Sequence, residues 1–244
     1  MKSVRLLLRL ALVMALATAV APAQKPTAAG HWEGNVQAPD GPVPMTIDLD
    51  RNEKGEWVGD LDAPSRNVMN LPLAKIVIEG AAISFELSGF PAKVAASLSE
   101  DGQSISGTLT FREDAVPLQL KRTGPPKVTL PPKSSPLSKE LEGRWEGTLE
   151  AGGQSFRLVL KLSKAADGTA TGAMDSVDQG ASNLALAGIV IDGPALRFQL
   201  PMVGGSYSGK LNTGATELAG EWTQGGRSLP LTFKRAAPAA EEKR

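Results

Sequence analysis

Apolar and polar residues alternate through the C-terminal half of the chain, and this period of two predicts strands that are buried on one face. Trp145, Gly147 and Leu149 fall on the inward side of a first strand, and the residues between them are polar. Seven further inward rows follow at intervals of about twelve residues. They are Phe156-Leu158-Leu160-Leu162, Ala170-Gly172-Met174, Leu184-Leu186 continuing as Ile189-Ile191, Leu196-Phe198-Leu200, Tyr207-Gly209-Leu211, Leu218-Gly220-Trp222 and Leu229-Leu231-Phe233. The fourth row changes parity before Ile189, which predicts a bulge or bend near Gly188.

The chain contains a tandem duplication. Residues 143–235 repeat residues 30–122 at a constant spacing of 113 positions (145 − 32), and 27 of the 93 registered positions are identical. That agreement is too extensive for a fixed offset to arise by chance, so each repeat is expected to form the same structural unit.

Turn signals separate the inward rows of the second repeat, at residues 166–168, 192–194, 212–214 and 224–226. No helical periodicity of useful length occurs outside the first residues of the chain. The pattern therefore predicts an all-β protein of two tandem antiparallel meander β-barrels, each of about eight short strands, with two-sheet sandwiches as the alternative arrangement.

The rest of the chain flanks these two modules. The predicted organisation is a signal peptide at residues 1–23, a tether at 24–29, β module 1 at 30–122, a Pro-rich linker at 123–142, β module 2 at 143–235 and a disordered tail at 236–244. The prolines of the linker favour an extended, semi-rigid spacer over a packed element.

The first residues have the features of a secretory signal. Lys2 and Arg5 precede an apolar run at residues 10–20, and Ala21-Pro22-Ala23 supplies a small-residue cleavage site before Gln24. The alternative, a membrane anchor, is disfavoured because the apolar run is short for a bilayer. We expect a periplasmic or secreted protein without stable membrane insertion after cleavage.

Composition narrows the classes of function. Without residues 1–23 the chain has 23 basic and 26 acidic residues, about −3 in charge, and these are spread along both repeats. A nucleic-acid partner would favour a basic face, so none is expected. The chain has no Cys, which excludes disulfides, thiolate metal sites and Cys nucleophiles. No cofactor is expected.

Parity and topology bring Trp and Arg residues together at one end of each barrel. The first and last strands of a closed meander are neighbours, so Arg235 is expected to lie over Trp145, and Arg122 over Trp32, as a plug. The alternative is a sugar or anion site at these four residues. Tyr207, the one inward hydroxyl, is expected to bond to backbone. The Gly-x-Trp motif and the Arg resemble those of lipocalin and avidin-like barrels.

Catalytic constellations are poorly represented. A Ser hydrolase needs a base, and the single His, His31, is expected to face solvent, as is its registered partner Arg144. The Gly-Ser-Tyr-Ser-Gly stretch at residues 205–209 has Tyr where a nucleophile elbow has Ser. Glu33 and Glu146 face outward in separate repeats, so a paired-carboxylate glycosidase site has no support.

A polar stretch at residues 175–180 follows the third strand of the second repeat. Asp175 registers with Asp62, whereas Asp178 registers with Ser65, and the spacing of a calcium loop is missing. Turn capping is the favoured role for Asp175, Asp178 and Gln179. The alternatives are contact with a metal, a ligand or a protein partner.

The second repeat also resembles the small β module that precedes the catalytic domain in exported bacterial α/β-hydrolases and related serine hydrolases. The likeness is carried by Gly143-x-Trp145-x-Gly147, residues 175–180 and the Trp222-x-Gln224-Gly225 stretch. The first repeat departs from it, with Leu109 in place of Trp222. No hydrolase domain follows, so the resemblance implies an accessory module and transfers no reaction.

Three functions remain as expectations. The first is an exported, non-catalytic accessory or binding protein that contacts an exported protein or an envelope component. The second is a carrier that holds a small apolar ligand beside its Trp residues. The third, a hydrolase, is the least favoured, because the chain offers one His and no Cys.

Overall fold

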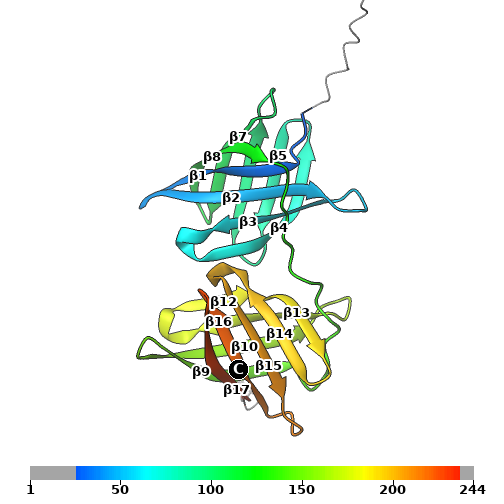
Figure 1. Ribbon diagram of the computed structural model, residues 1–244, viewed down its shortest axis with the longest axis vertical. Coiled ribbons are helices and arrows are strands. Elements are labelled where there is room, and N and C mark those ends of the chain that lie inside the picture. Colours follow the sequence, from blue (N-terminus) through cyan, green and yellow to red (C-terminus); the bar gives the residue numbers. More distant parts are fainter. Residues whose placement is uncertain (1–25, 237–244) are drawn as a thin grey trace, which may run out of the picture.

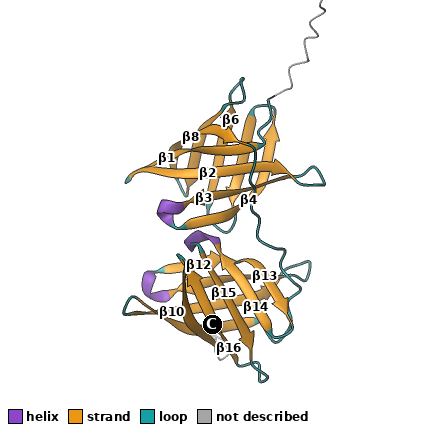
Figure 2. Ribbon diagram, in the orientation of Figure 1, coloured by secondary structure: helices purple, strands orange, loops and turns teal. Residues whose placement is uncertain are grey.

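The computed structural model describes residues 26–236, so the predicted signal peptide and all but the first residue of the predicted tail lie outside the described residues. Two antiparallel barrels follow one another along the chain (Figures 1 and 2). Barrel 1 consists of β1 (Gly30–Ala38), β2 (Gly41–Arg51), β3 (Trp57–Ala63), β4 (Val68–Glu79), β5 (Ala82–Leu87), β6 (Ala92–Leu98), β7 (Ser104–Phe111) and β8 (Asp114–Gly124). Barrel 2 consists of β9 (Gly143–Ala151), β10 (Gln154–Lys164), β11 (Ala170–Ser176), β12 (Ala181–Ala185), β13 (Ala187–Asp192), β14 (Ala195–Leu200), β15 (Gly205–Leu211), β16 (Glu217–Gln224) and β17 (Arg227–Arg235).

The strands form meanders, which confirms the predicted barrels over the sandwich alternative. In barrel 1 each strand pairs with the next and β8 returns to β1, so the sheet is closed. In barrel 2 β17 pairs with β9, and the sheet runs from β12 round to β13. These two strands occupy the place of β4, so the ninth strand comes from a break in the fourth strand. Short 3-10 helices connect consecutive strands at three places in the described chain: η1 (Pro64–Arg66), η2 (Val177–Gln179) and η3 (Pro201–Val203). Among residues 26–236 we find no helix long and apolar enough to span a membrane.

The predicted irregularity near Gly188 is confirmed. The pairing of β13 with β14 shifts between Ala187 and Val190, and Gly188 has a φ of +57°. Barrel 1 has the same shift in β4, where the registered residue, Lys75, has a φ of +50°. The bulge therefore belongs to the repeat, although only one copy uses the residue type that adopts this backbone conformation without strain.

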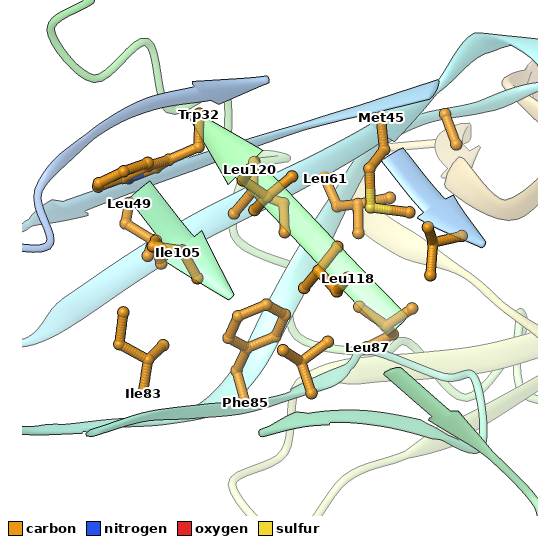
Figure 3. Close-up of a cluster of buried hydrophobic side chains, with 14 of the residues drawn as sticks. Trp32, Met45, Leu49, Leu61, Ile83, Phe85, Leu87, Ile105, Leu118 and Leu120 are labelled. Atoms are coloured by element: carbon orange, nitrogen blue, oxygen red, sulfur yellow. The ribbon is translucent and has the colours of Figure 1, made fainter. Parts of the chain in front are cut away.

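The inward rows pack into one apolar core per barrel. Figure 3 shows that of barrel 1, with Trp32 at one end and Met45 and Leu87 toward the other. In barrel 2 Phe198, Tyr207 and Phe233 fill the centre, with ring centroids 5.2 and 5.3 Å apart. The hydroxyl of Tyr207 donates to the Leu218 carbonyl at 3.0 Å, as expected for an inward hydroxyl that bonds to backbone.

The predicted Trp–Arg plug is confirmed in both barrels. The guanidinium carbon of Arg122 lies 4.2 Å from the Trp32 ring centroid, and the distance from Arg235 to Trp145 is the same. Both indoles are 0% exposed. Each indole N–H donates at 3.0 Å to the carbonyl four residues earlier, that of Ala28 or Leu141.

The repeat extends further toward the N-terminus than the sequence identities indicate. Arg122 donates to the carbonyls of Thr27 and Ala29, and Arg235 donates to those of Glu140 and Glu142, which are the same positions in register. The three residues before each first strand are therefore part of the barrel end.

The expectation that the Pro-rich segment is a spacer and not a packed element is wrong. Its backbone N–H groups at Lys127 and Thr129 donate to carboxylates on the outer face of barrel 1. Its later residues bond to barrel 2, and Leu137 and Leu141 are buried there, at 5% and 1% exposed. The prolines keep the segment extended, but buried acceptors and apolar surface on both barrels hold it in place.

The barrels touch through β4 of barrel 1 and η3 of barrel 2. A Cβ added at Gly204, directly after η3, would lie 2.8 Å from the Asn67 carbonyl oxygen of barrel 1. Met202 of η3 packs against the core of barrel 1. Each barrel thus turns the end opposite its plug toward this contact; we call that end the mouth.

Candidate functional site

Barrel 1 holds an apolar cavity of about 570 Å³ at its mouth. Its wall comes from every strand of the barrel except β6, from η1 and the connecting turns, and from Met202 of barrel 2. The lining residues are Val36, Ala38, Pro39, Asp40, Val43, Met45, Leu61, Ala63, Arg66, Val68, Leu71, Leu87, Phe90, Leu109, Phe111, Asp114, Val116 and Met202. A cavity of this volume is within the range of small-molecule sites.

Four positions that line the cavity carry smaller side chains in barrel 1 than in barrel 2. Four lining positions carry Val36, Val43, Leu109 and Val116, where the second repeat has Leu149, Phe156, Trp222 and Leu229, in that order. Deeper in the barrel, Val94 stands where the second repeat has Tyr207. Because protein interiors are otherwise close-packed, each smaller side chain at a lining position leaves space unfilled, and this space contributes to the cavity.

Polar groups lie only at the rim of the cavity. Arg66 pairs with Asp40 at 2.5 Å, and this ion pair lowers the pKa of the Asp40 carboxyl. Phe90 and Phe111 stack with their centroids 4.8 Å apart. The lining residues between rim and floor are aliphatic, so the cavity offers dispersion and desolvation rather than directed hydrogen bonds.

The corresponding end of barrel 2 has two pockets, an inner one of about 280 Å³ and another of about 490 Å³ that is shared with Pro64, Asn67 and Met69 of barrel 1. The wall of the inner pocket includes the bulky counterparts Phe156 and Trp222, and it also carries polar side chains, Ser176, Gln179 and Gln224. In barrel 1 the same three positions are Ala63, Arg66 and Phe111. The two mouths therefore differ in how their space is divided and in the polarity of the walls, and barrel 1 has the more apolar site.

The Trp and Arg residues predicted as an alternative site lie at the far end of the barrels. Trp32, Arg122, Trp145 and Arg235 all take part in the plugs, where backbone carbonyls accept hydrogen bonds from the indoles and the guanidinium groups. None of the four lines the cavity of barrel 1. Burial lowers the pKa of Arg122, which keeps its charge because the starting value is far above neutrality.

The polar stretch after β11 is held together by its own contacts. Asp175 accepts the Asn183 backbone N–H at 2.8 Å, and Asp62 does the same for Asn70 in barrel 1. Burial alone would raise the pKa of Asp175, but the Asn183 N–H and the ammonium of Lys161, 2.7 Å away, outweigh it and lower the pKa.

The neighbouring residues of this stretch are also paired within the chain. Asp178 binds the Arg157 guanidinium at 2.7 Å, which lowers the pKa of Asp178. Gln179 accepts the Ser176 hydroxyl at 2.7 Å. Only the Asp175–Asn183 contact is a side-chain-to-backbone bond of the capping kind favoured from the sequence, whereas Asp178 pairs with a strand residue and Gln179 with a hydroxyl.

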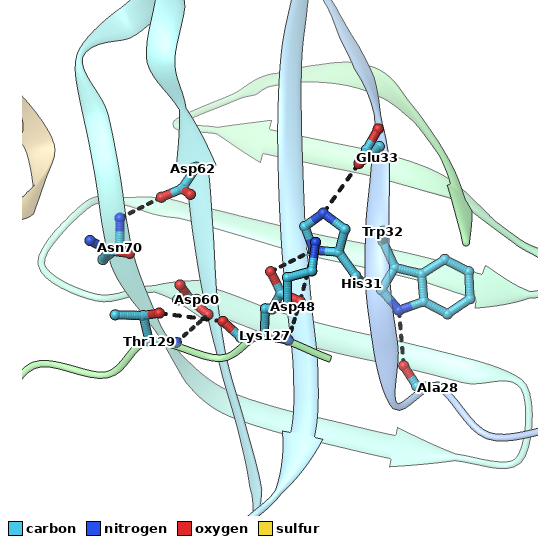
Figure 4. Close-up of polar contacts among 10 residues, drawn as sticks. All are labelled: Ala28, His31, Trp32, Glu33, Asp48, Asp60, Asp62, Asn70, Lys127 and Thr129. Carbon is cyan, nitrogen blue, oxygen red and sulfur yellow. Dashed lines mark hydrogen bonds and ion pairs between the residues drawn. The ribbon is translucent and has the colours of Figure 1, made fainter. Parts of the chain in front are cut away.

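His31 does not face solvent, and that expectation is wrong. Its side chain is only 12% exposed, because Asp48 of β2 lies beside it, 2.8 Å from Nδ1, and the linker passes over both (Figure 4). Lys127 N–H donates to Asp48 at 2.7 Å, and Thr129 N–H donates to Asp60 at 3.3 Å. Desolvation raises the pKa of Asp60 to about 6, against the opposing effect of the Thr129 hydrogen bond.

Metal binding finds no support in the arrangement of these side chains. Across residues 26–236 no group of three or more His, Cys, Asp or Glu residues is placed to hold an ion. Asp48 and Asp60 anchor the linker through hydrogen bonds, and His31 contacts Asp48.

The sequence contains a signal for the cavity, the difference in side-chain size between registered positions, which the alternation pattern alone does not reveal. Alternation shows which residues point inward, and it does so equally for Val36 and Leu149. Only a comparison of side-chain size between registered positions indicates that one barrel is underfilled.

Comparison with known proteins adds little. No protein-family model and no curated protein matches the chain. A protein of unknown function from the DUF3598 family of Nostoc punctiforme is 14% identical, with a TM-score of 0.27, and the match covers 85% of this chain and 96% of that one. A candidate outer membrane protein of Bacteroides fragilis is 11% identical, also with a TM-score of 0.27, over 86% of this chain and 98% of that one. Neither likeness is close enough to carry an argument, so function is argued from the cavity.

Proposed function

We propose that this chain is an exported, non-catalytic binding protein whose barrel 1 holds a small apolar ligand. The observation that carries the proposal is the apolar cavity of about 570 Å³ at the mouth of barrel 1, whereas the space at the mouth of barrel 2 is divided between two smaller pockets with more polar walls. A duplicated barrel that needed only to fold could keep the larger side chains of the second repeat. Their replacement at four lining positions leaves space that a ligand can use.

The lining defines the ligand's chemistry. Val36, Leu61 and Leu87 line the interior and offer no hydrogen-bonding side chain, so the buried part of the ligand is a hydrocarbon chain or ring system. A polar end, where the ligand has one, would lie at the rim near Asp40 and Arg66.

Barrel 2 contributes the supporting wall. Met202 reaches the cavity from η3, and an unbranched Met side chain adapts readily to ligands of different shape. The apolar ligand is thus expected at the contact between barrels and not beside Trp32 or Trp145.

A cavity-filling variant tests the proposal. In Val43→Phe/Leu109→Trp the residues of barrel 2 replace those of barrel 1, so the fold is retained while the cavity shrinks. Native mass spectrometry of the chain from residue 24 onward, with dodecanoic acid, palmitic acid and retinol, should give a one-to-one adduct with at least one of them. The double variant should lose that adduct.

Asp114→Arg is the matched control, because Arg227 is its registered counterpart. It changes the rim charge without filling the apolar interior, so any adduct that the native chain forms should persist. Equal binding by the native chain and the cavity-filled variant would contradict the proposal, as would the absence of any adduct with apolar compounds, including those extracted from the exported fraction of the native host.

A further inference from the structure

The linker fills a gap in the sheet of barrel 2 through strand-like backbone hydrogen bonds and one isolated β-bridge, between Pro136 and Thr169. Residues 134–137 lie between the start of β11 and β13, two segments that do not pair with each other. Ala170 N–H donates to the Ser135 carbonyl at 2.7 Å, and Ser135 N–H donates to the Ile189 carbonyl at 2.8 Å. The hydroxyls of this segment accept as well, Ser134 from Ile189 N–H at 3.2 Å and Ser135 from Ile191 N–H at 3.0 Å.

Barrel 1 has the same gap. β3 and β4 pair only between Asp60 and Ala63 of β3, which leaves the start of β3 and the end of β4 unpaired with each other. The backbone groups of Trp57, Ile76 and Ile78 correspond to those of Ala170, Ile189 and Ile191, which the linker serves in barrel 2. The linker crosses β3 only at Asp60, through Thr129, before it continues to barrel 2. We call this gap the β3–β4 slot.

Side-chain burial also differs between the two gaps. Ile189 and Ala170 are 0% and 3% exposed under the linker. Their counterparts Ile76 and Trp57 are only half-buried, and the neighbouring Val77 is 49% exposed. By the 113-residue register the counterpart of residues 134–137 is residues 21–24, which lie outside the described residues and mostly within the predicted signal peptide.

We propose that the β3–β4 slot of barrel 1 accepts an extended segment of a partner protein, in the manner of residues 134–137 in barrel 2. Main-chain hydrogen bonds from an added strand would provide affinity, and the alternating side chains would provide specificity. The segment has a small hydroxyl residue where Ser135 stands, followed by a proline and a leucine-sized residue. It lacks the Pro-Pro pair at residues 131–132, since those prolines pack on Gly188, and barrel 1 has Lys75 there.

This surface is separate from the ligand cavity. Trp57, Ile76 and Ile78 do not line the cavity, so partner binding and ligand binding can succeed or fail independently.

A peptide supplied in trans tests the slot. The probe is Lys-Ser-Ser-Pro-Leu-Ser-Lys, residues 133–139 of the linker, added to the ¹⁵N-labelled chain from residue 24 onward. Saturable chemical-shift changes are expected at the amides of Trp57, Ile76 and Ile78, and not at those of Ala170, Ile189 and Ile191. A control peptide with Pro in place of Ser135 lacks the N–H that reaches the β4 carbonyl, and it should bind roughly fivefold more weakly or worse.

Three results would overturn the proposal. One is the absence of saturable change at the slot, and another is change confined to barrel 2, which would mean that the peptide exchanges with the linker itself. The third is strong protection of the Trp57, Ile76 and Ile78 amides from hydrogen exchange before any peptide is added. If that protection depends on protein concentration, a second copy fills the slot, and if it does not, the chain's own N-terminal residues do.

Discussion

The two barrels share one end and differ at the other. At the plug end each has a buried Trp, an Arg stacked on it at 4.2 Å and the same hydrogen bonds to the three residues before the first strand. At the mouth, barrel 1 has one apolar cavity of about 570 Å³, whereas barrel 2 has two pockets of about 490 and 280 Å³ with more polar walls. After a duplication, contacts that close the barrel are retained in both copies, while side chains that fill it are free to diverge. The difference between copies therefore locates the candidate site more sharply than either copy alone.

The backbone between the third and fourth strands has the same conformation in both barrels. Asn67 and Gly180 both have positive φ, as do Asn70 and Asn183, and each pair is in register. These positions fix how the third strand passes to the fourth. The backbone of this stretch and its Asp175 contact are thus part of the common scaffold, whereas Asp178 and Gln179 have Ser65 and Arg66 at their places in barrel 1.

The largest expected effect comes from the plug. Trp145→Ala and Trp32→Ala should each destabilise their own barrel by about 3–5 kcal/mol, because each removes a fully buried indole and the partner of an Arg. Native-state hydrogen exchange reads the two barrels separately and gives both values. A cost below about 1 kcal/mol in either barrel would break the equivalence of the two ends.

A smaller effect is expected when the mouth of barrel 2 is converted into that of barrel 1. Phe156→Val/Trp222→Leu should destabilise barrel 2 by about 2–4 kcal/mol through lost packing and the cavity it leaves. The variant should also gain binding of an apolar dye such as 1-anilinonaphthalene-8-sulfonate, measured by fluorescence. Lost stability without dye binding would show that side-chain size alone does not distinguish the mouths.

Asp60, which accepts a hydrogen bond from the linker on the outer face of barrel 1, makes the stability of that barrel depend on pH. The pKa of Asp60 is raised from 3.8 to about 6, mainly by desolvation, so the folded state binds the proton more tightly than the unfolded state. This contribution to stability is complete below about pH 4 and is lost as the pH rises through 6. Asp60→Asn should therefore raise the stability of barrel 1 at pH 7 by about 1–3 kcal/mol, because the amide oxygen still accepts from Thr129.

Urea unfolding at pH 4.5 and pH 7, followed by hydrogen exchange in each barrel, checks this. Ala173 occupies the position of Asp60 in barrel 2, so barrel 2 is the internal reference and should not respond. The same stability gain at both pH values would show that the carboxyl does not titrate as described.

The smallest effect is expected at the bulge. Lys75→Gly should change the stability of barrel 1 by less than about 1 kcal/mol, because relief of the left-handed conformation is offset by the more flexible unfolded chain and by loss of the exposed Lys75–Glu86 pair. Gly188→Ala should be costlier, since its Cβ would stand 2.9 Å from Pro132 of the linker. Thermal unfolding of both variants measures the two stability changes. An equal cost would mean that the linker moves away from a Cβ at position 188 without loss of stability.

Much of the scaffold could be predicted from the sequence. Alternation identified the inward rows, the change of parity before Ile189 identified the bulge, and strand neighbourhood in a closed meander placed Arg235 over Trp145. Each of these depends on periodicity or on the order of strands, and both can be read along the chain.

The linker and the site could not be predicted in the same way. Parity places His31 on the outer face but does not say that residues 127–129 will pass over it. The linker is held there by the hydrogen bond between Lys127 and Asp48, which are 79 positions apart in the sequence. The cavity depends on the sum of many side-chain volumes in three dimensions. The repeat gives part of this information, because registered pairs such as Val43 and Phe156 differ in side-chain size.

The hydrogen bonds that tie Arg122 to Thr27 and Arg235 to Glu140 join residues 95 positions apart. Closing a loop of that length costs about 4 kcal/mol in chain entropy, beyond a constant, before any contact repays it. Each barrel can complete its folding only when its last strand has emerged, so closure is expected to be slow and late. A chain that crosses a membrane N-terminus first would expose the whole of barrel 1 before barrel 2 is available, and the order of folding would follow the order of the repeats.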